Sequence, residues 1–100
     1  MDHYNVNFMP QALADLDQIY SYISYVLLEP QTASRLLNRI ENAILSLEQM
    51  PYRCPERSRG IYAYQGYRQL LVEGYTVIFR VDENEKRVLI VTVRYSRSKF

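Results

Sequence analysis

Hydrophobic and polar residues alternate at the start of the chain, and the spacing then becomes helical. From residue 3 to residue 8 every second residue is apolar, a period of two that is typical of a strand with one buried face. After Pro10 the apolar residues recur every three or four positions. The pattern therefore predicts a strand over residues 3–8, then a helix that begins at Pro10 and ends before Pro30.

A second helical spacing runs from Ala33 to Leu47, and Pro51 closes it. Only a few residues around Pro30 separate the two helical stretches. A connection this short predicts an antiparallel helical hairpin whose combined apolar stripe packs on a sheet. Residues 51–59 have no period and include three arginines, so they predict a cationic loop.

The part of the chain after Gly60 is rich in Tyr, Val, Ile and Leu and predicts strands over residues 62–65, 67–72, 75–82 and 87–95. Short turns between them predict consecutive antiparallel hairpins, and the apolar run 88–91 predicts a central last strand covered on both faces. The predicted fold is a single α+β domain over residues 1–100. It has an N-terminal strand, an antiparallel helical hairpin, and three or four antiparallel strands in a curled sheet with the helices on one face.

The turns decide which side chains share a face of this sheet. If the turn at residues 73–74 has two residues, Arg68 and Arg80 lie on opposite faces, whereas a bulge there places them on the same face. In the next hairpin, a four-residue loop over 83–86 places Arg80 on the face of Tyr95. The pattern therefore predicts that Arg80 and Tyr95 are neighbours and leaves the place of Arg68 open.

Charge is divided unevenly along the chain. Residues 1–50 carry a net charge of −4 and residues 51–100 a net charge of +5, which together give the total of +1. Eight of the ten basic residues in the second half are arginine, whose planar guanidinium suits bidentate contact with phosphate or carboxylate. The charge pattern predicts a polyanionic target or an acidic protein partner.

Composition narrows the class of protein. A chain of 100 residues with 48% hydrophobic residues, three glycines and four prolines is typical of one compact globular domain. Cys54 is the only cysteine, which excludes an internal disulfide and a cysteine-based zinc site and favours a reducing compartment. The start lacks the features of a secretory signal, and no apolar run approaches the roughly 20 residues of a membrane span. We therefore expect a cytoplasmic location and no membrane contact.

The basic residues suit one chemistry, the cleavage of RNA by attack of a ribose 2′-hydroxyl on its own phosphate. This reaction needs neutralisation of phosphate charge, a proton acceptor and a proton donor, and it needs no metal. The candidate catalytic residues are Arg68, Arg80 and Arg97, which would hold phosphate charge, and Tyr95, which would transfer a proton or stack on a base. The candidate residues for binding RNA or phosphate are Arg53, Arg57, Arg59, Arg94 and Lys99. The alternative is that these arginines bridge carboxylates or coat a solvated surface.

Other kinds of site have little support in the sequence. His3 is the only histidine and falls on the polar side of the first strand, with no serine or cysteine arrangement to use it as a base. Asp15 and Asp17 are two residues apart on a helix and point to different sides. The sequence has no phosphate-binding glycine loop, metal-ligand spacing or dinucleotide fingerprint, so we expect neither a cofactor nor a metal.

Taken together and in order, these segments resemble the RelE/ParE superfamily of toxins from bacterial type II toxin–antitoxin modules. The resemblance runs nearly end to end. It is carried by Tyr4-x-Val6-x-Phe8-x-Pro10-x-Ala12, Asp15-Leu16, Ile19-x-x-Tyr22-Ile23, the helix from Ala33 through Ala43-Ile44, Leu47, Met50-Pro51, Tyr67-Arg68-x-Leu70-x-Val72-x-x-Tyr75-x-Val77-x-Phe79-Arg80-Val81-Asp82 and Val88-x-Ile90-x-x-Val93-x-Tyr95-x-Arg97.

This resemblance implies a small toxin that a cognate acidic antitoxin holds inactive. RelE-like members cleave mRNA in the ribosomal A site, whereas ParE-like members poison DNA gyrase and need no nuclease site. Residue matching places Arg68 at a basic position of the nuclease branch and places Tyr95 and Arg97 in its C-terminal functional segment. Thr76, however, stands where those nucleases have an arginine, and the length of the two helices resembles the gyrase branch.

The cationic second half favours ribosome-dependent mRNA cleavage as the first hypothesis for the molecular target. Poisoning of DNA gyrase is the alternative. A third hypothesis is a non-toxic nucleic-acid-binding module, for which binding would depend steeply on salt and expression would not arrest growth.

Overall fold

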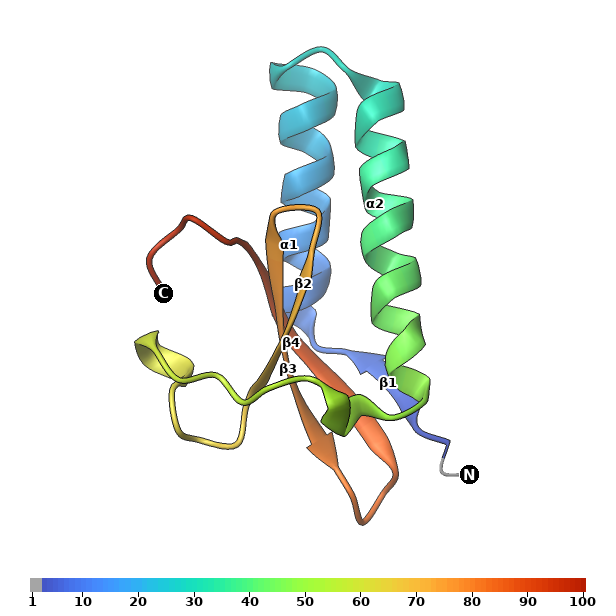
Figure 1. Ribbon diagram of the computed structural model, residues 1–100. Coiled ribbons are helices and arrows are strands. Elements are labelled where there is room, and N and C mark those ends of the chain that lie inside the picture. The colour runs from blue at the N-terminus through green and yellow to red at the C-terminus, as the bar shows by residue number, and fades with distance from the viewer. Residues whose placement is uncertain (1–2) are drawn as a thin grey trace.

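The computed structural model describes residues 3–100 (Figure 1). Two helices stand side by side above a sheet of four strands. The strands and long helices are β1 (Asn5–Phe8), α1 (Pro10–Ser21), α2 (Pro30–Leu45), β2 (Arg68–Val72), β3 (Tyr75–Asp82) and β4 (Arg87–Tyr95). The short helical turns are the π-helical η1 (Tyr22–Val26) and the 3₁₀ turns η2 (Ser46–Glu48), η3 (Pro51–Arg53) and η4 (Gly60–Tyr62).

The sheet has the strand order β1-β4-β3-β2, which confirms the α+β class and the central position of β4. Two expected details of the sheet are wrong. β1 pairs with β4 in parallel, with Asn5 opposite Arg87, because the helical hairpin and the β2–β3 hairpin return the chain in its starting direction. The sheet is also open, with β1 and β2 as its edges, and not curled.

The strand expected over residues 62–65 is wrong as well. This stretch is the end of η4 followed by a turn. Gly60, Tyr64 and Gly66 have φ values of 77°, 56° and 85°, which lie outside the extended region that a sheet requires. The rings of Tyr62 and Tyr67 instead pack edge to face with their centroids 5.1 Å apart, so residues 60–67 form a compact loop.

The antiparallel helical hairpin is present (Figure 1). α1 continues into the π-helical η1 as far as Val26, and α2 begins at Pro30 itself, three residues before the predicted start. Proline fits the first turn of a helix because its missing N–H has no helical acceptor there. Leu28 links the helices in the left-handed region, with φ 58°.

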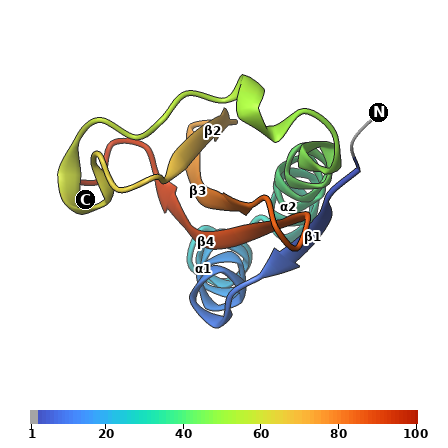
Figure 2. The same cartoon turned by 90° about the horizontal axis from the view of Figure 1, so that it is seen from below.

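The core lies between the hairpin and one face of the sheet. α1 packs along β4 and α2 packs over β2 (Figures 1 and 2). Fully buried Ile40 and Ile44 of α2 belong to the same cluster as Val77 and Phe79 of β3. Burial of side chains of this size stabilises the fold by about 1.5–3 kcal/mol each. The opposite face of β4 is only half covered, because Leu89 and Val91 remain partly exposed, so the expectation of full cover on both faces is wrong.

A bulge in the β3–β4 pair decides which residues face the core. Phe79 lies opposite Ile90, but Ile78 lies opposite Thr92, so Val91 is an extra residue in β4. An extra residue inverts the faces of everything beyond it. Residues 93 and 95 of β4 therefore lie on the core side of the sheet.

Candidate functional site

Arg80 and Tyr95 lie on opposite faces of the sheet, so the expectation that they are neighbours is wrong. Arg80 lies opposite Leu89 before the bulge, and Tyr95 lies opposite Tyr75 after it. The Arg80 guanidinium sits 5.6 Å from the centre of the Tyr67 ring on the outer face. The sequence pattern carried no signal for the bulge, because β4 is apolar on both sides of it.

Arg68 is committed to contacts within the protein. The turn at residues 73–74 has two residues, so Arg68 lies opposite Phe79 and on the other face from Arg80. Its guanidinium donates to the Cys54 carbonyl oxygen at 2.6 Å and lies 3.8 Å from the Glu56 carboxylate. Its side chain is only 21% exposed. Arg68 therefore pins the loop after α2 to the edge strand β2.

Arg57 is the most buried of the candidate cations, with 3% of its surface exposed. Its guanidinium donates to the Arg59 carbonyl oxygen at 3.0 Å, the Gln69 side-chain oxygen at 2.9 Å and the Phe100 carbonyl oxygen at 3.2 Å, and it lies over the Phe100 ring. Burial, and to a smaller extent the charge of Arg59, lower the pKa of Arg57. Arg57 thus ties the 60–67 loop and the C-terminal segment to the sheet.

Arg53 and Arg94 are also engaged in contacts. Arg53 is exposed, and its guanidinium donates to the Gln49 carbonyl oxygen at 2.7 Å and to the Ser46 hydroxyl at 2.8 Å. Arg94 donates to the Thr92 hydroxyl at 3.1 Å and lies over the ring of Phe100. Both residues brace neighbouring segments.

Three further candidates, Arg59, Arg97 and Lys99, are exposed and gather around one hollow of about 460 Å³. We call this hollow the loop–tail pocket. Its remaining lining residues are Arg57, Gly60, Ser96, Ser98 and Phe100. Within residues 3–100, no Asp or Glu side chain forms an ion pair with its three exposed cations. The structure therefore brings together one subset of the predicted phosphate-binding residues.

A second hollow is apolar and was missed by sequence reasoning. It has a volume of about 680 Å³ and lies between the α1–η1 segment and the ends of β3 and β4. We call it the apolar groove. Its lining residues are Asp15, Gln18, Ile19, Tyr22, Ile23, Leu27, Tyr75, Val93, Arg94 and Tyr95. The available signal was the charge-free stretch over residues 20–28, where exposed apolar side chains continue past the stripe that the core uses.

Two of the three tyrosines that line the apolar groove pack against each other. The ring centroids of Tyr75 and Tyr95 lie 5.6 Å apart. Burial, then the neighbouring Tyr95 and Tyr22, raise the pKa of Tyr75. Its hydroxyl therefore stays protonated at neutral pH, which suits hydrogen bonding and stacking better than proton acceptance.

Asp15 links the apolar groove to the sheet. Its buried carboxylate accepts hydrogen bonds from the Thr92 hydroxyl, from the Val93 backbone N–H at 3.0 Å and from the Gln11 amide at 2.8 Å. A buried carboxylate with these donors is structurally satisfied. Asp15 therefore holds α1 against the bulged part of β4, a role that its spacing from Asp17 did not reveal.

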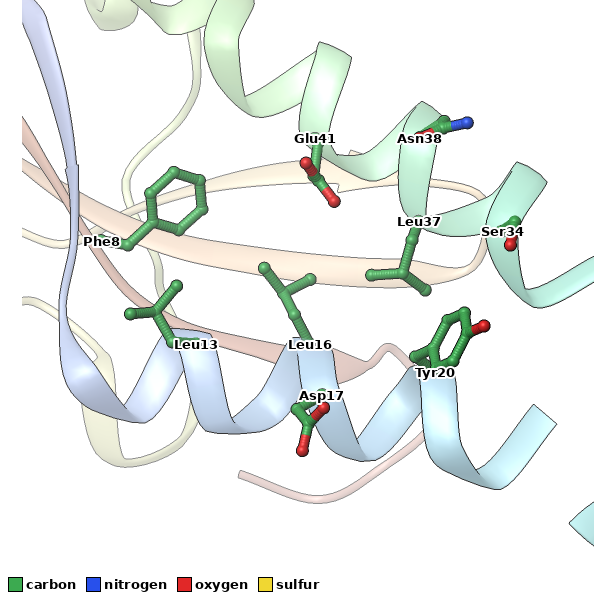
Figure 3. Close-up of a pocket in the computed structure, with 9 residues that line it drawn as sticks. All are labelled: Phe8, Leu13, Leu16, Asp17, Tyr20, Ser34, Leu37, Asn38 and Glu41. Carbon is green, nitrogen blue, oxygen red and sulfur yellow. The ribbon is translucent and has the colours of Figure 1, made fainter. Parts of the chain in front are cut away.

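A third hollow of about 470 Å³ opens between the two helices (Figure 3). The side chains of Leu13, Leu16, Tyr20 and Leu37 point toward one another across it, and Phe8 closes one end. Leu16 and Leu37 belong to the core. Core residues therefore form part of the apolar lining of this hollow, and Asp17, Ser34, Asn38 and Glu41 form its polar part.

The part of the chain that the structure describes contains neither a cluster of metal-ligating side chains nor a membrane-spanning helix. Within residues 3–100, no group of three or more His, Cys, Asp or Glu side chains is placed to hold a metal ion. No helix among those residues is long and apolar enough to cross a membrane.

The fold and its hollows define a class of small α+β proteins in which a helical hairpin covers one face of an open four-stranded sheet. The family model described as "ParE toxin of type II toxin-antitoxin system, parDE" matches residues 6–100. The chain therefore belongs to this family of toxins, within the RelE/ParE superfamily that the sequence resembles.

Solved structures support the same fold. A chain of a chromosomal ParDE toxin–antitoxin system from P. aeruginosa has a TM-score of 0.77 at 25% identity, covering 95% of this chain and 98% of that one. A chain of the RelBE2 toxin–antitoxin complex from Mycobacterium tuberculosis has a TM-score of 0.62 at 24% identity, covering 93% and 98%. A mutant of the E. coli toxin RelE in the free state has a TM-score of 0.63 at 11% identity, covering 95% and 85%. No curated protein sequence matches this chain significantly.

Proposed function

We propose that this toxin arrests growth by acting on DNA gyrase and is not a ribosome-dependent nuclease. The observation that carries the proposal is the bulge at Val91, which separates Arg80 from Tyr95. The family model, which describes ParE toxins, supports the same branch. This proposal reverses the preference for mRNA cleavage that charge alone suggested.

A nuclease needs its phosphate-binding groups and its proton-transfer groups on one surface. Here Arg68 is bound to Cys54 and Glu56 at the sheet edge, and Arg80 and Tyr95 project from opposite faces. Thr76, which stands where the nuclease branch has an arginine, is buried, and its hydroxyl lies 2.8 Å from that of Ser96. These placements support a toxin that acts by binding.

Ribosome-dependent mRNA cleavage remains the second candidate, because Tyr95 and Arg97 are both exposed and only two residues apart. In this alternative, Arg97 and the other cations of the loop–tail pocket would hold the message, and Tyr95 would stack on a base.

The inhibitory partner in this proposal is a cognate antitoxin, as in the RelBE2 complex from Mycobacterium tuberculosis. We place apolar side chains of the antitoxin in the apolar groove, which Ile19, Tyr22 and Leu27 line. Arg94, which lines the groove and also contacts Thr92 and Phe100, would meet an acidic residue of the antitoxin. The proposed place of action is the cytoplasm, where gyrase meets DNA.

The deciding experiment combines induced expression with two assays. Purified toxin is added to gyrase and supercoiled DNA, and mRNA 5′ ends are mapped on translating ribosomes from induced cells. We expect trapped gyrase–DNA cleavage complexes and intact messages. New codon-associated 5′ ends that vanish in Tyr95→Phe, with gyrase unaffected, would overturn the proposal in favour of the nuclease.

The antitoxin site has its own test, with a matched pair of variants. Tyr22 lines the apolar groove, whereas Tyr25, 72% exposed, lies three residues further along η1 and is not among its lining residues. We expect Tyr22→Glu to weaken antitoxin binding at least about tenfold, a change of about 1.4 kcal/mol, and Tyr25→Glu to leave it nearly unchanged. Equal losses in calorimetric titrations would remove the groove as the docking site.

A further inference from the structure

The loop–tail pocket is formed by two segments that are far apart in the sequence. Arg59 comes from the loop after η3, and Arg97 and Lys99 come from the segment after β4. Figures 1 and 2 show the η4 loop and the C-terminal segment side by side at one end of the sheet. The pocket therefore exists only in the folded chain.

The two backbone segments that form the floor of the loop–tail pocket lie in close contact. Arg57 holds both segments through hydrogen bonds to the carbonyl oxygens of Arg59 and Phe100. Gly60 has φ 77°, and a Cβ atom at this position would overlap the Phe100 carbonyl oxygen. Only glycine permits this approach of the two backbones. The pocket is thus held in place before any ligand arrives.

The lining of the pocket indicates the kind of ligand. No lining side chain is acidic, and the Ser98 hydroxyl adds a hydrogen-bonding group, whereas the Ser96 hydroxyl already lies 2.8 Å from that of Thr76. Phe100 is the only aromatic residue in the lining, and its ring is occupied by Arg57 at 4.4 Å and by Arg94 at 5.5 Å. A single-stranded base would find no free ring to stack on.

A protein partner fits this pocket poorly as well. The buried centre of a protein–protein interface is apolar, and the loop–tail pocket offers no free apolar side chain. Interfaces with DNA are polar and strongly positive, and arginine and lysine contact the phosphates without reading the bases. The chemistry of the lining therefore favours the phosphate backbone of a DNA duplex.

We propose that Arg59, Arg97 and Lys99 bind the phosphate backbone of duplex DNA, so that the toxin contacts the DNA segment that gyrase holds. This inference rests on the proposed function for its biological setting. The contact itself requires only the toxin and DNA, so it can be tested without gyrase.

The test is fluorescence anisotropy of a DNA duplex of about 20 base pairs, titrated with toxin between about 50 and 200 mM salt. Three phosphate contacts predict a slope of about −2.7 for the logarithm of the binding constant against that of salt concentration. We expect the triple variant R59Q/R97Q/K99Q to bring this slope close to zero. The control variant R35Q/R39Q/R87Q also removes three positive charges, but at positions outside the loop–tail pocket. It should keep the salt dependence of the wild type. Urea unfolding of both triple variants checks that they are folded.

Several results would overturn the inference. One is that no binding of the wild-type toxin to the DNA duplex can be detected at the lowest salt concentration. A second is an equal loss of slope in both triple variants, which would indicate general charge attraction. A third is tighter binding of a single-stranded RNA through the same three residues. A fourth is weaker antitoxin binding by R59Q/R97Q/K99Q with unchanged DNA binding, which would assign the pocket to an acidic protein segment.

A parallel gyrase cleavage assay separates this inference from the proposed function. If the wild type binds DNA with the expected slope but traps no gyrase, the pocket stands and the proposed target is wrong. If gyrase is trapped equally by the wild type and by R59Q/R97Q/K99Q, and the triple variant keeps the DNA slope, the pocket is wrong and the target stands.

Discussion

The two ends of the β3–β4 hairpin use charge in opposite ways. At the turn between the strands, Glu83 accepts hydrogen bonds from the hydroxyls of Tyr4 and Tyr52 at 2.8 Å each and pairs with Lys86. We call this the turn corner. At the other end, the three exposed cations of the loop–tail pocket form no ion pair with any Asp or Glu side chain of residues 3–100. The turn corner uses its charges for structure, and the loop–tail pocket leaves its charges for an outside molecule.

This contrast shows why a count of basic residues is a poor guide to a binding site. Arg57 and Arg68 belong to the cationic second half, yet their donors bind the protein's own carbonyl oxygens. Arg59 lies two residues from Arg57 and is exposed. Burial and hydrogen bonding separate the structural arginines from the available ones, and neither is visible in the charge pattern.

Of the variants compared, Arg57→Ala, at the loop–tail pocket, should lower the free energy of unfolding the most. The change leaves the Gln69 side-chain oxygen and the Phe100 carbonyl oxygen without their donor, which should lower the free energy of unfolding by about 3 kcal/mol. The control Arg59→Ala, in the same loop, should change it by less than about 0.5 kcal/mol. Urea unfolding measures both, and equal losses would mean that Arg57 does not hold the pocket together.

Gly60→Ala, also at the loop–tail pocket, should have the next largest effect. An alanine at φ 77° costs about 1–2 kcal/mol, and its methyl group would also push Phe100 away. We expect faster amide hydrogen exchange in residues 96–100, with the helices unaffected. Gly66→Ala is the matched control, because Gly66 has a similar φ of 85° but open space around it. If both variants speed up exchange equally, the backbone contact at Gly60 has no special role.

Tyr4→Phe should have a smaller effect, and it falls at the turn corner. The variant loses the hydrogen bond to Glu83 from a tyrosine that is otherwise buried, at a cost of about 1 kcal/mol. Tyr52→Phe loses the same kind of bond from an exposed ring and should cost less. Thermal unfolding compares the two variants. A larger loss from Tyr52→Phe would contradict the expectation that the hydrogen bond of the buried tyrosine, Tyr4, contributes more to stability.

The smallest expected effect is the pH dependence of the turn corner. Hydrogen bonds from Lys86, Tyr52 and Tyr4, in that order of strength, lower the pKa of Glu83 from 4.5 to about 2. Because the folded pKa is the lower one, Glu83 stabilises the fold above pH 4.5, and this contribution disappears as the pH falls from 4.5 towards 2.

Urea unfolding over this pH range measures that contribution, and Glu83→Gln is the control. We expect the free energy of unfolding of Glu83→Gln to depend less on pH than that of the wild type. The loop–tail pocket has no acidic side chain in its lining, so its side chains should add no pH dependence in this range. Identical pH profiles for the wild type and the variant would show that other carboxylates carry the acid sensitivity.

Much of the fold follows from local patterns in the sequence. The period of two over residues 3–8, the helical spacing after Pro10 and the turn signal at residues 73–74 each act over a few neighbouring residues. Such patterns predicted β1, both helices, the last three strands and the α+β class. The family resemblance, confirmed by the match over residues 6–100, came from the order of the same segments.

The site depended on features that local patterns do not contain. The bulge at Val91 separated Arg80 from Tyr95, because one extra residue inverts every side chain that follows it. The burial of Arg57, the approach of Gly60 to Phe100 and the convergence of Arg59 with Arg97 join segments about 40 residues apart. The sequence by itself determined the elements and the supply of arginines. Only the tertiary structure decided which arginines remain free, because that depends on which carbonyl oxygens and carboxylates the fold brings within hydrogen-bonding distance.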